Sequence, residues 1–131
     1  MERCFVKLSR GGAATPPRDW SGTGCSRQTF VIITVLRGRI RPGAEKEYQE
    51  LGIEMYRLAH ATPGFISAKS FYADDGEGVT IVLFADAESQ RAWRDHPAHR
   101  KVQERGRTHI FSEVSSHVAE VTYSMSHRHE V

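Results

Sequence analysis

Residues 29–40, TFVIITVLRGRI, constrain the fold most, because they form a strand that needs cover on both sides. Their length and their β-branched and apolar side chains are typical of a β-strand, and Pro42-Gly43 then makes a turn. Alternate side chains of a strand point to opposite faces of its sheet. One face carries Val31, Ile33 and Val35, and the other carries Phe30, Ile32, Thr34 and Leu36. Since both sets are largely apolar, we expect both faces of the sheet to be buried.

The rest of the chain alternates helix and strand patterns. Apolar residues recur every three or four positions in AEKEYQELGIEMYRLAHA, which predicts an amphipathic helix, and DDGEG predicts a hairpin turn. The expected elements are, in order, strand 29–40, helix 44–61, strands 65–75 and 79–86, helices 86–93 and 97–111, and strand 115–125. This β-α-β-β-α-α-β order predicts a ferredoxin-like α+β fold with a four-stranded antiparallel sheet. The helices cover one sheet face, so we expect a second copy of the chain to cover the other face in a homodimer.

Composition narrows the classes of function. A net charge of +2, with basic and acidic residues interleaved, offers no stripe for a nucleic-acid backbone. No apolar run approaches the roughly 20 residues that span a bilayer, and the start lacks the apolar segment of a secretory signal. We therefore expect no nucleic-acid or membrane partner and a cytoplasmic location. Neither G-x-G-x-x-G nor a Walker loop occurs, so no nucleotide cofactor is expected.

Residues 1–28 differ from the rest in being rich in Gly, Pro, Ser and Thr without an apolar period. We expect a disordered or loosely packed N-terminal extension, or else an arm that packs on a partner subunit through Trp20. Both cysteines lie in this extension, where a disulfide would join only a tail. One folded domain is then expected over residues 29–123, followed by a frayed tail over residues 124–131.

The stretch AWRDHPAHRKVQERGRTHI fits a metal site, an ordinary packed helix or a catalytic site. His96 precedes Pro97, whose ring disfavours the helical conformation at that position, so His96 is expected to cap the helix start. No familiar ligand spacing follows, which argues against a metal site. His99, Gln103 and Arg107 recur at intervals of four, which places them on one stripe of a helix.

Three segments resemble the antibiotic biosynthesis monooxygenase family. They are VLRGRIRPGAEKEY, TPGFISAKSFYADD and AWRDHPAHRKVQERGR, and a closing V-x-E-V follows at 118–121, so the similarity spans about residues 29–123. The resemblance implies a dimeric α+β barrel, with a cleft between the sheet and the helices of each subunit. It also implies one of several activities. Some members oxidise polycyclic phenols to quinones with O₂ and no metal or flavin, whereas others open haem.

The haem-degrading members of that family use an Asn, a Trp and a His. Those positions align near Leu36, Phe84 and Gln103 of this chain, and none of the three residue types matches. The resemblance therefore does not extend to opening haem, and we expect no metal and no cofactor.

The residues and the resemblance together predict a cofactor-independent oxygenase that acts on an aromatic, phenolic or quinol-type small molecule with O₂. His99 is the candidate base, because an unperturbed imidazole titrates near neutrality, and Gln103 or Arg107 would hold the developing oxyanion. The candidate substrate-binding residues are Trp93, Phe84, Leu36, Met55 and His96. The alternative is a dimeric module that binds or senses a small ligand without converting it. A deep cavity with His99 unpaired and facing in would favour the enzyme, and a cleft filled by Leu36, Met55 and Phe84 would favour the module.

Overall fold

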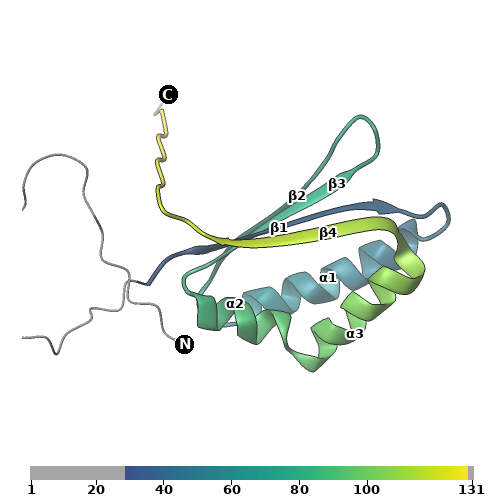
Figure 1. Ribbon diagram of the computed structural model, residues 1–131, viewed down its shortest axis with the longest axis horizontal. Coiled ribbons are helices and arrows are strands. Elements are labelled where there is room, and N and C mark those ends of the chain that lie inside the picture. The colour runs from purple at the N-terminus through teal and green to yellow at the C-terminus, as the bar shows by residue number, and fades with distance from the viewer. Residues whose placement is uncertain (1–28, 130–131) are drawn as a thin grey trace, which may run out of the picture.

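The computed structural model describes residues 29–129 of the chain. A four-stranded antiparallel sheet carries its helices on one face, as Figure 1 shows. The elements are, in chain order, β1 (Ile32–Ile40), α1 (Glu45–Ala61), β2 (Phe65–Tyr72), β3 (Gly78–Phe84), α2 (Ala87–Arg94), α3 (Pro97–Arg105), the π-helical turn η1 (Gly106–Ile110) and β4 (Phe111–Glu120). The predicted ferredoxin-like α+β fold is confirmed. The predictions for residues 1–28, with the Trp20 arm and the cysteine pair, lie outside the described residues.

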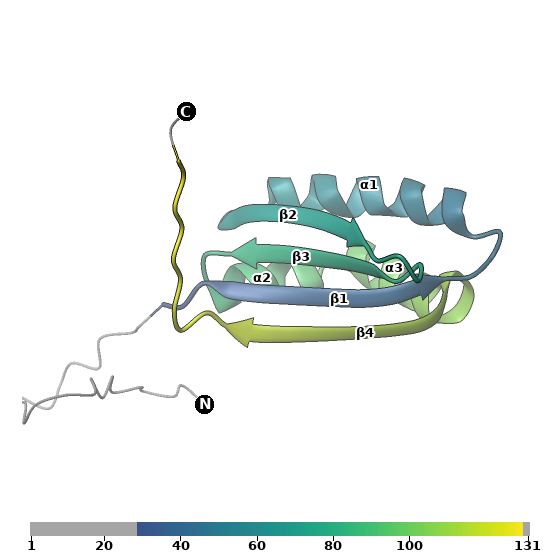
Figure 2. The same ribbon diagram turned by 90° about the horizontal axis from the view of Figure 1, so that it is seen from above.

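The strand order β2-β3-β1-β4 places β1 and β3 in the middle of the sheet (Figure 2). Antiparallel partners share a face, so the pairing of Ile32 with Phe84 puts the even-numbered residues of both strands on one side. That side faces the helices, where Thr34 and Val82 are buried. The side chains of β1 are thus divided between the two sheet faces as the sequence predicts.

The face turned away from the helices is apolar in its central part and carries no described helix (Figure 1). In β1 and β3 its apolar part consists of Ile33, Val35, Val79, Ile81 and Leu83, and Arg37 and Arg39 lie on the same face toward the end of β1. The apolar side chains are only half buried within one chain. Cover by a second copy of the chain stays a prediction. No helix within residues 29–129 is long and apolar enough to cross a membrane.

The core lies where α1 and α2 meet the sheet. Its buried cluster consists of Ala59, Val82, Phe84 and Trp93. The ring centroid of Phe84 lies 5.5 Å from that of Trp93 and 5.8 Å from that of Phe65. Gln90 Nε2 donates to Thr34 Oγ1 at 3.4 Å, so each of these two buried polar side chains has a hydrogen-bond partner. Each large side chain buried here contributes about 1.5–3 kcal/mol, so the cluster holds α2 firmly against the sheet.

Side-chain caps fix the starts of α2 and α3. The Asp86 carboxylate accepts from the Ser89 backbone N–H at 2.7 Å, and His96 Nδ1 accepts from the Ala98 N–H at 3.1 Å. Pro97 occupies the first turn of α3, as its sequence position indicates. The expected helix-capping role of His96 is therefore confirmed.

The junction of the last helix and the last strand differs from the sequence prediction. The chain is helical as far as Ile110, close to the expected Phe111, but its last turn, η1, is π-helical. The strand predicted over 115–125 is wrong in its bounds, because β4 runs from Phe111 to Glu120. Gly106 packs so closely on the Phe111 ring that a Cβ there would lie 3.2 Å from it, so a larger residue would force the ring to shift. β4 stops at Glu120 because its last partner, Ile32, is the first residue of β1.

Candidate functional site

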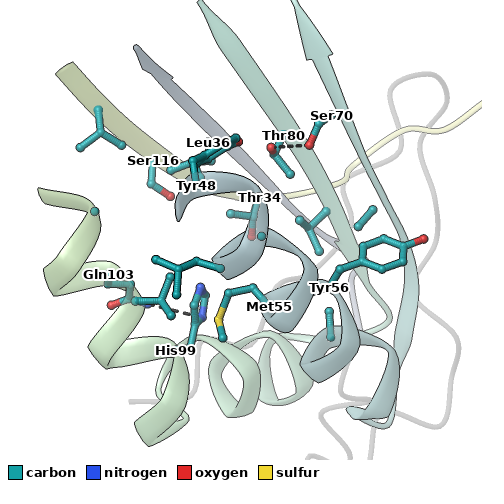
Figure 3. A pocket seen from close by; sticks show the side chains of 18 of the residues that line it. Thr34, Leu36, Tyr48, Met55, Tyr56, Ser70, Thr80, His99, Gln103 and Ser116 are labelled. Atoms are coloured by element: carbon teal, nitrogen blue, oxygen red, sulfur yellow. Dashed lines mark hydrogen bonds between the residues drawn. The ribbon is translucent and has the colours of Figure 1, made fainter. Parts of the chain in front are cut away.

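A cavity of about 520 Å³ lies between the sheet and the helices α1 and α3 (Figure 3). Its floor is the helix-facing side of the sheet, to which β1 contributes Thr34 and Leu36. Met55 and Tyr56 of α1 line it from the opposite side, and Tyr56 is 49% exposed, so the cavity opens to solvent. A largely apolar cavity of some 300–1,000 Å³ with a few polar groups is typical of small-molecule sites.

His99 and Trp93 together form one end of this cavity. Their ring centroids lie 4.2 Å apart with the planes tilted by 36°, and Trp93 packs in turn on Phe84. The indole Nε1 of Trp93 donates to the Met55 carbonyl oxygen at 3.3 Å, which ties α2 to α1. The imidazole of His99 is therefore held against the cavity wall by an aromatic stack that is anchored in the core.

Hydrogen bonding selects one tautomer of His99. Its Nδ1 lies 3.1 Å from the Trp93 carbonyl oxygen, which can only accept, so Nδ1 carries the proton and donates it. Nε2 then keeps its lone pair, and no hydrogen bond to it forms within the part of the chain that the structure describes. The backbone of Trp93 thus orients the ring and leaves one nitrogen basic.

Burial lowers the pKa of His99 below its ordinary value. The hydrogen bond to the Trp93 carbonyl opposes that shift in pKa, and the nearby charge of His96 adds to it. His99 is therefore neutral at neutral pH and carries its free lone pair on Nε2. A half-buried neutral imidazole at the wall of an apolar cavity is suited to accept a proton from a weakly acidic ligand.

Gln103 and Arg107 are placed less favourably than the sequence stripe predicts. Gln103 lies one turn from His99, but its Nε2 donates to the Arg94 carbonyl oxygen at 3.0 Å. The same Nε2 lies 3.5 Å from His99 Nδ1, where it cannot donate because that nitrogen already carries a proton. Arg107 lines the cavity from η1 and is exposed, because α3 ends before it. The structure keeps His99 and Gln103 together and moves Arg107 to the solvent edge.

The other expected binding residues divide into two groups. Leu36, Met55 and Trp93 line the cavity. Phe84 and His96 do not, which corrects their expected place at the ligand. Phe84 is fully buried beneath Trp93, and His96 is exposed at the start of α3, where its ring serves as the cap.

Sequence reasoning missed a set of hydroxyl groups that also line the cavity. They belong to Tyr48, Ser70, Thr80 and Ser116. The signal for two of them was present, since Ser70 and Thr80 interrupt strand patterns at even-numbered positions. Those positions share a face with the buried Val82, so they point toward the helices.

No group of three His, Cys, Asp or Glu side chains within residues 29–129 is placed to hold a metal ion. The absence of a bound metal in the working protein stays a prediction.

The fold and the cavity define a class of small α+β proteins with a ligand-sized apolar cavity beneath a four-stranded sheet. The family model for antibiotic biosynthesis monooxygenase matches residues 30–105, which is more than half of the chain, and the chain belongs to that family. The uncharacterized protein YqjZ of Bacillus subtilis is 28% identical over 87 residues, which cover 66% of this chain and 76% of YqjZ.

Solved structures share the fold at low sequence identity. Rv0793 from Mycobacterium tuberculosis has a TM-score of 0.64 at 19% identity, and the match covers 73% of this chain and 99% of that protein. A variant of SnoaB, a cofactor-independent oxygenase from Streptomyces nogalater, has a TM-score of 0.63 at 16% identity and covers 74% and 98% of the two chains. Such likeness establishes the common fold, a four-stranded sheet with helices on one face.

Proposed function

We propose that this protein is a cofactor-independent monooxygenase that oxidises a phenolic or quinol-type aromatic molecule with O₂. The proposal rests on the hydrogen bonding of His99, because the Trp93 carbonyl fixes the imidazole proton on Nδ1. Its Nε2 lone pair is left for a ligand in an apolar cavity of about 520 Å³. Membership of the antibiotic biosynthesis monooxygenase family supports the same reaction class.

His99 Nε2 takes the proton of the bound phenol, which leaves a phenolate and an imidazolium. The phenolate gives one electron to O₂ far more readily than the neutral phenol does, and superoxide then recombines with the ring carbon opposite the oxygen. The imidazolium returns its proton to the peroxide. Loss of the ring proton breaks the O–O bond and leaves a carbonyl at that carbon.

The overall reaction balances without any added reductant. One oxygen atom of O₂ becomes the new quinone carbonyl, and the other leaves as water with the phenol hydrogen and the ring hydrogen. All four electrons that reduce O₂ come from the substrate. The protein has only to make the phenolate, hold it flat and exclude bulk water, and these tasks match a base on the wall of an apolar cavity.

The cavity lining supports an aromatic substrate. Trp93 offers an indole beside the base, and Met55 offers a thioether that packs well against rings. Leu36 closes the floor between two polar strand positions. A flat aromatic molecule would bury its faces on these groups and keep its oxygen atoms for the polar ends.

We propose that the working form is a homodimer whose subunits pack through their open sheet faces. The apolar patch of Ile33, Val35, Ile81 and Leu83 on this face supports the homodimer, because a contiguous apolar patch is seldom left in water. The same contact would close the two sheets into a barrel. The cavity lies on the other side of each sheet, so each subunit keeps its own site.

The second candidate function is a module that binds an aromatic ligand without oxidising it. The hydrogen bonding of Gln103 favours this alternative, since its amide nitrogen already donates one of its two hydrogens to the Arg94 carbonyl, which leaves one hydrogen at most for an oxyanion. On this view His99 would only accept a hydrogen bond from the ligand.

Oxygen uptake separates the two candidates. The purified protein would be incubated with a panel of hydroxynaphthalenes and anthrones in an oxygen electrode, and the products would be identified by mass spectrometry. The oxygenase should consume one O₂ per quinone formed, without hydrogen peroxide and without an added reductant. A protein that binds members of the panel but never accelerates their oxidation is a binding module.

A further inference from the structure

A second polar group lies in the cavity away from His99, and the proposed chemistry does not use it. Ser70 Oγ and Thr80 Oγ1 are 2.8 Å apart, and both line the cavity floor (Figure 3). Tyr48 of α1 lines the same part of the cavity. Burial raises the pKa of Tyr48, the phenol of Tyr72 adds to that rise, and the Thr80 hydroxyl opposes it. We call Tyr48, Ser70 and Thr80 the hydroxyl cluster.

Strand register fixes where the hydroxyl cluster lies. Thr80 pairs with Ser70 on one side and with Leu36 on the other, and Leu36 pairs with Ser116 of β4. These residues form one row across the helix-facing side of the sheet. Leu36 separates the Ser70–Thr80 pair from Ser116, so the pair stands alone at the β2–β3 side.

The hydroxyl cluster and His99 lie at two ends of the cavity. His99 stacks on Trp93, which packs on Phe84 at the end of β3. Thr80 is four residues from Phe84 on the same strand and the same face, a separation of about 13 Å at the usual rise of a strand. Between them lies Val82, which is apolar and also lines the cavity. A ligand that reached from one end to the other would be apolar in its middle.

Hydroxyl groups can donate and accept, so they can bind either a hydroxyl or a carbonyl oxygen of a ligand. Ser70 and Thr80 share a single hydrogen bond, which leaves one of the two hydroxyl hydrogens without a partner among them. Tyr48 stays protonated at neutral pH because its pKa is raised. The cluster carries no charge, so it fits a neutral oxygen substituent better than a carboxylate.

We infer that the hydroxyl cluster binds a second oxygen substituent at the end of the substrate remote from the oxidised phenol. The preferred ligand is then an elongated fused aromatic with oxygen atoms at both ends, and a monohydroxylated one is a poorer ligand. This inference rests on the proposed function for the identity of the ligand, and it adds the recognition of the far end.

Binding without oxygen tests the inference apart from catalysis. The affinities of 2-hydroxyanthracene and 2,6-dihydroxyanthracene would be measured by calorimetry under nitrogen, where no oxidation can occur. The full chain should bind the diol more tightly by about 3- to 10-fold, the net effect of one added neutral hydrogen bond. Equal affinities, or no binding of either molecule, would overturn the inference.

Variants then test whether these hydroxyls carry the preference. The pair Ser70→Ala with Thr80→Val removes both hydroxyls and nearly keeps the side-chain volumes, and it should bring the affinity ratio to about 1 while the monohydroxylated ligand binds within about twofold of before. Thr80→Ser, made in the otherwise unchanged chain, keeps a hydroxyl at this position and should retain the preference. Ser116→Ala, from the far end of the same row, is the matched control and should also retain it.

A preference that survives loss of both strand hydroxyls, or one that Ser116→Ala abolishes, would show that the cluster is not the subsite. Thermal melting of each variant would show that its fold is intact. Failure of the proposed function looks different. In that case the wild-type preference persists under nitrogen, but no member of the panel is oxidised faster in air.

Discussion

Trp93 should support the fold and help to lower the pKa of His99, and its substitution tests the two roles together. The indole is 9% exposed, stacks on His99 at 4.2 Å and packs on Phe84 at 5.5 Å. Its Nε1 also donates to the Met55 carbonyl. The bond from His99 Nδ1 goes to the backbone of Trp93, so a substitution keeps that bond and removes only the ring.

The structure gives different magnitudes for two substitutions of Trp93. Trp93→Ala empties a core position and should cost about 3–5 kcal/mol of unfolding free energy. Trp93→Phe keeps a ring on Phe84 and loses the bond to Met55, so it should cost about 1 kcal/mol, or roughly 4–8 °C in melting temperature. In Trp93→Ala, water replaces the indole beside His99, so the desolvation that lowers the His99 pKa is relieved and that pKa should rise toward its ordinary value.

Chemical denaturation measures the stabilities, and an NMR titration of the His99 ring measures its pKa in each variant. The reasoning is refuted if Trp93→Phe is as destabilised as Trp93→Ala, because the ring would then not be the main contact. It is also refuted if the pKa of His99 falls when the indole is removed.

Three further predictions concern assembly, metal content and pH. Light scattering should give about twice the chain mass of 14.8 kDa, and Ile81→Lys on the open sheet face should reduce it to one chain mass; a monomeric wild type would contradict the homodimer. Elemental analysis should find no stoichiometric zinc or iron in the purified protein, and haem titration should give no Soret band that His99→Ala abolishes. Because burial lowers the pKa of His99, the unfolded chain takes up that proton first, so stability should fall as pH drops below about 6.5, and His99→Gln should flatten this part of the profile. An unchanged profile would argue that His99 is not desolvated.

The strand and helix patterns were sufficient to predict the fold, and the family resemblance placed the cleft between the sheet and the helices. Strict alternation in residues 29–40 divides the side chains between two faces, and Thr34 and Leu36 do lie on the face with the cavity. Local chemistry was sufficient for the start of α3 as well, since His96 caps it as predicted. These features depend on residues that are near neighbours in the sequence, so they can be predicted from the sequence alone.

Features that depend on packing between distant elements could not be predicted. Phe84 faces inward by alternation, but only the docking of α2 shows that Trp93 stands between it and the cavity. The stripe of His99, Gln103 and Arg107 assumes a continuous helix, and η1 interrupts it where Gly106 meets the Phe111 ring. The hydroxyl cluster joins three elements, so its members are not near neighbours along the chain.

The most direct test of the proposed chemistry compares the rates of oxidation by wild type, His99→Ala and His96→Ala on one substrate of the panel, followed by oxygen uptake between pH 6 and 10. Removal of a general base typically lowers the rate by about 100- to 10,000-fold, so His99→Ala should lose at least about 100-fold in kcat at pH 7. Its residual rate should rise with pH as the phenol ionises without help. His96→Ala, which removes only the cap of α3, should keep most of its kcat. A fully active His99→Ala at pH 7 would contradict the account.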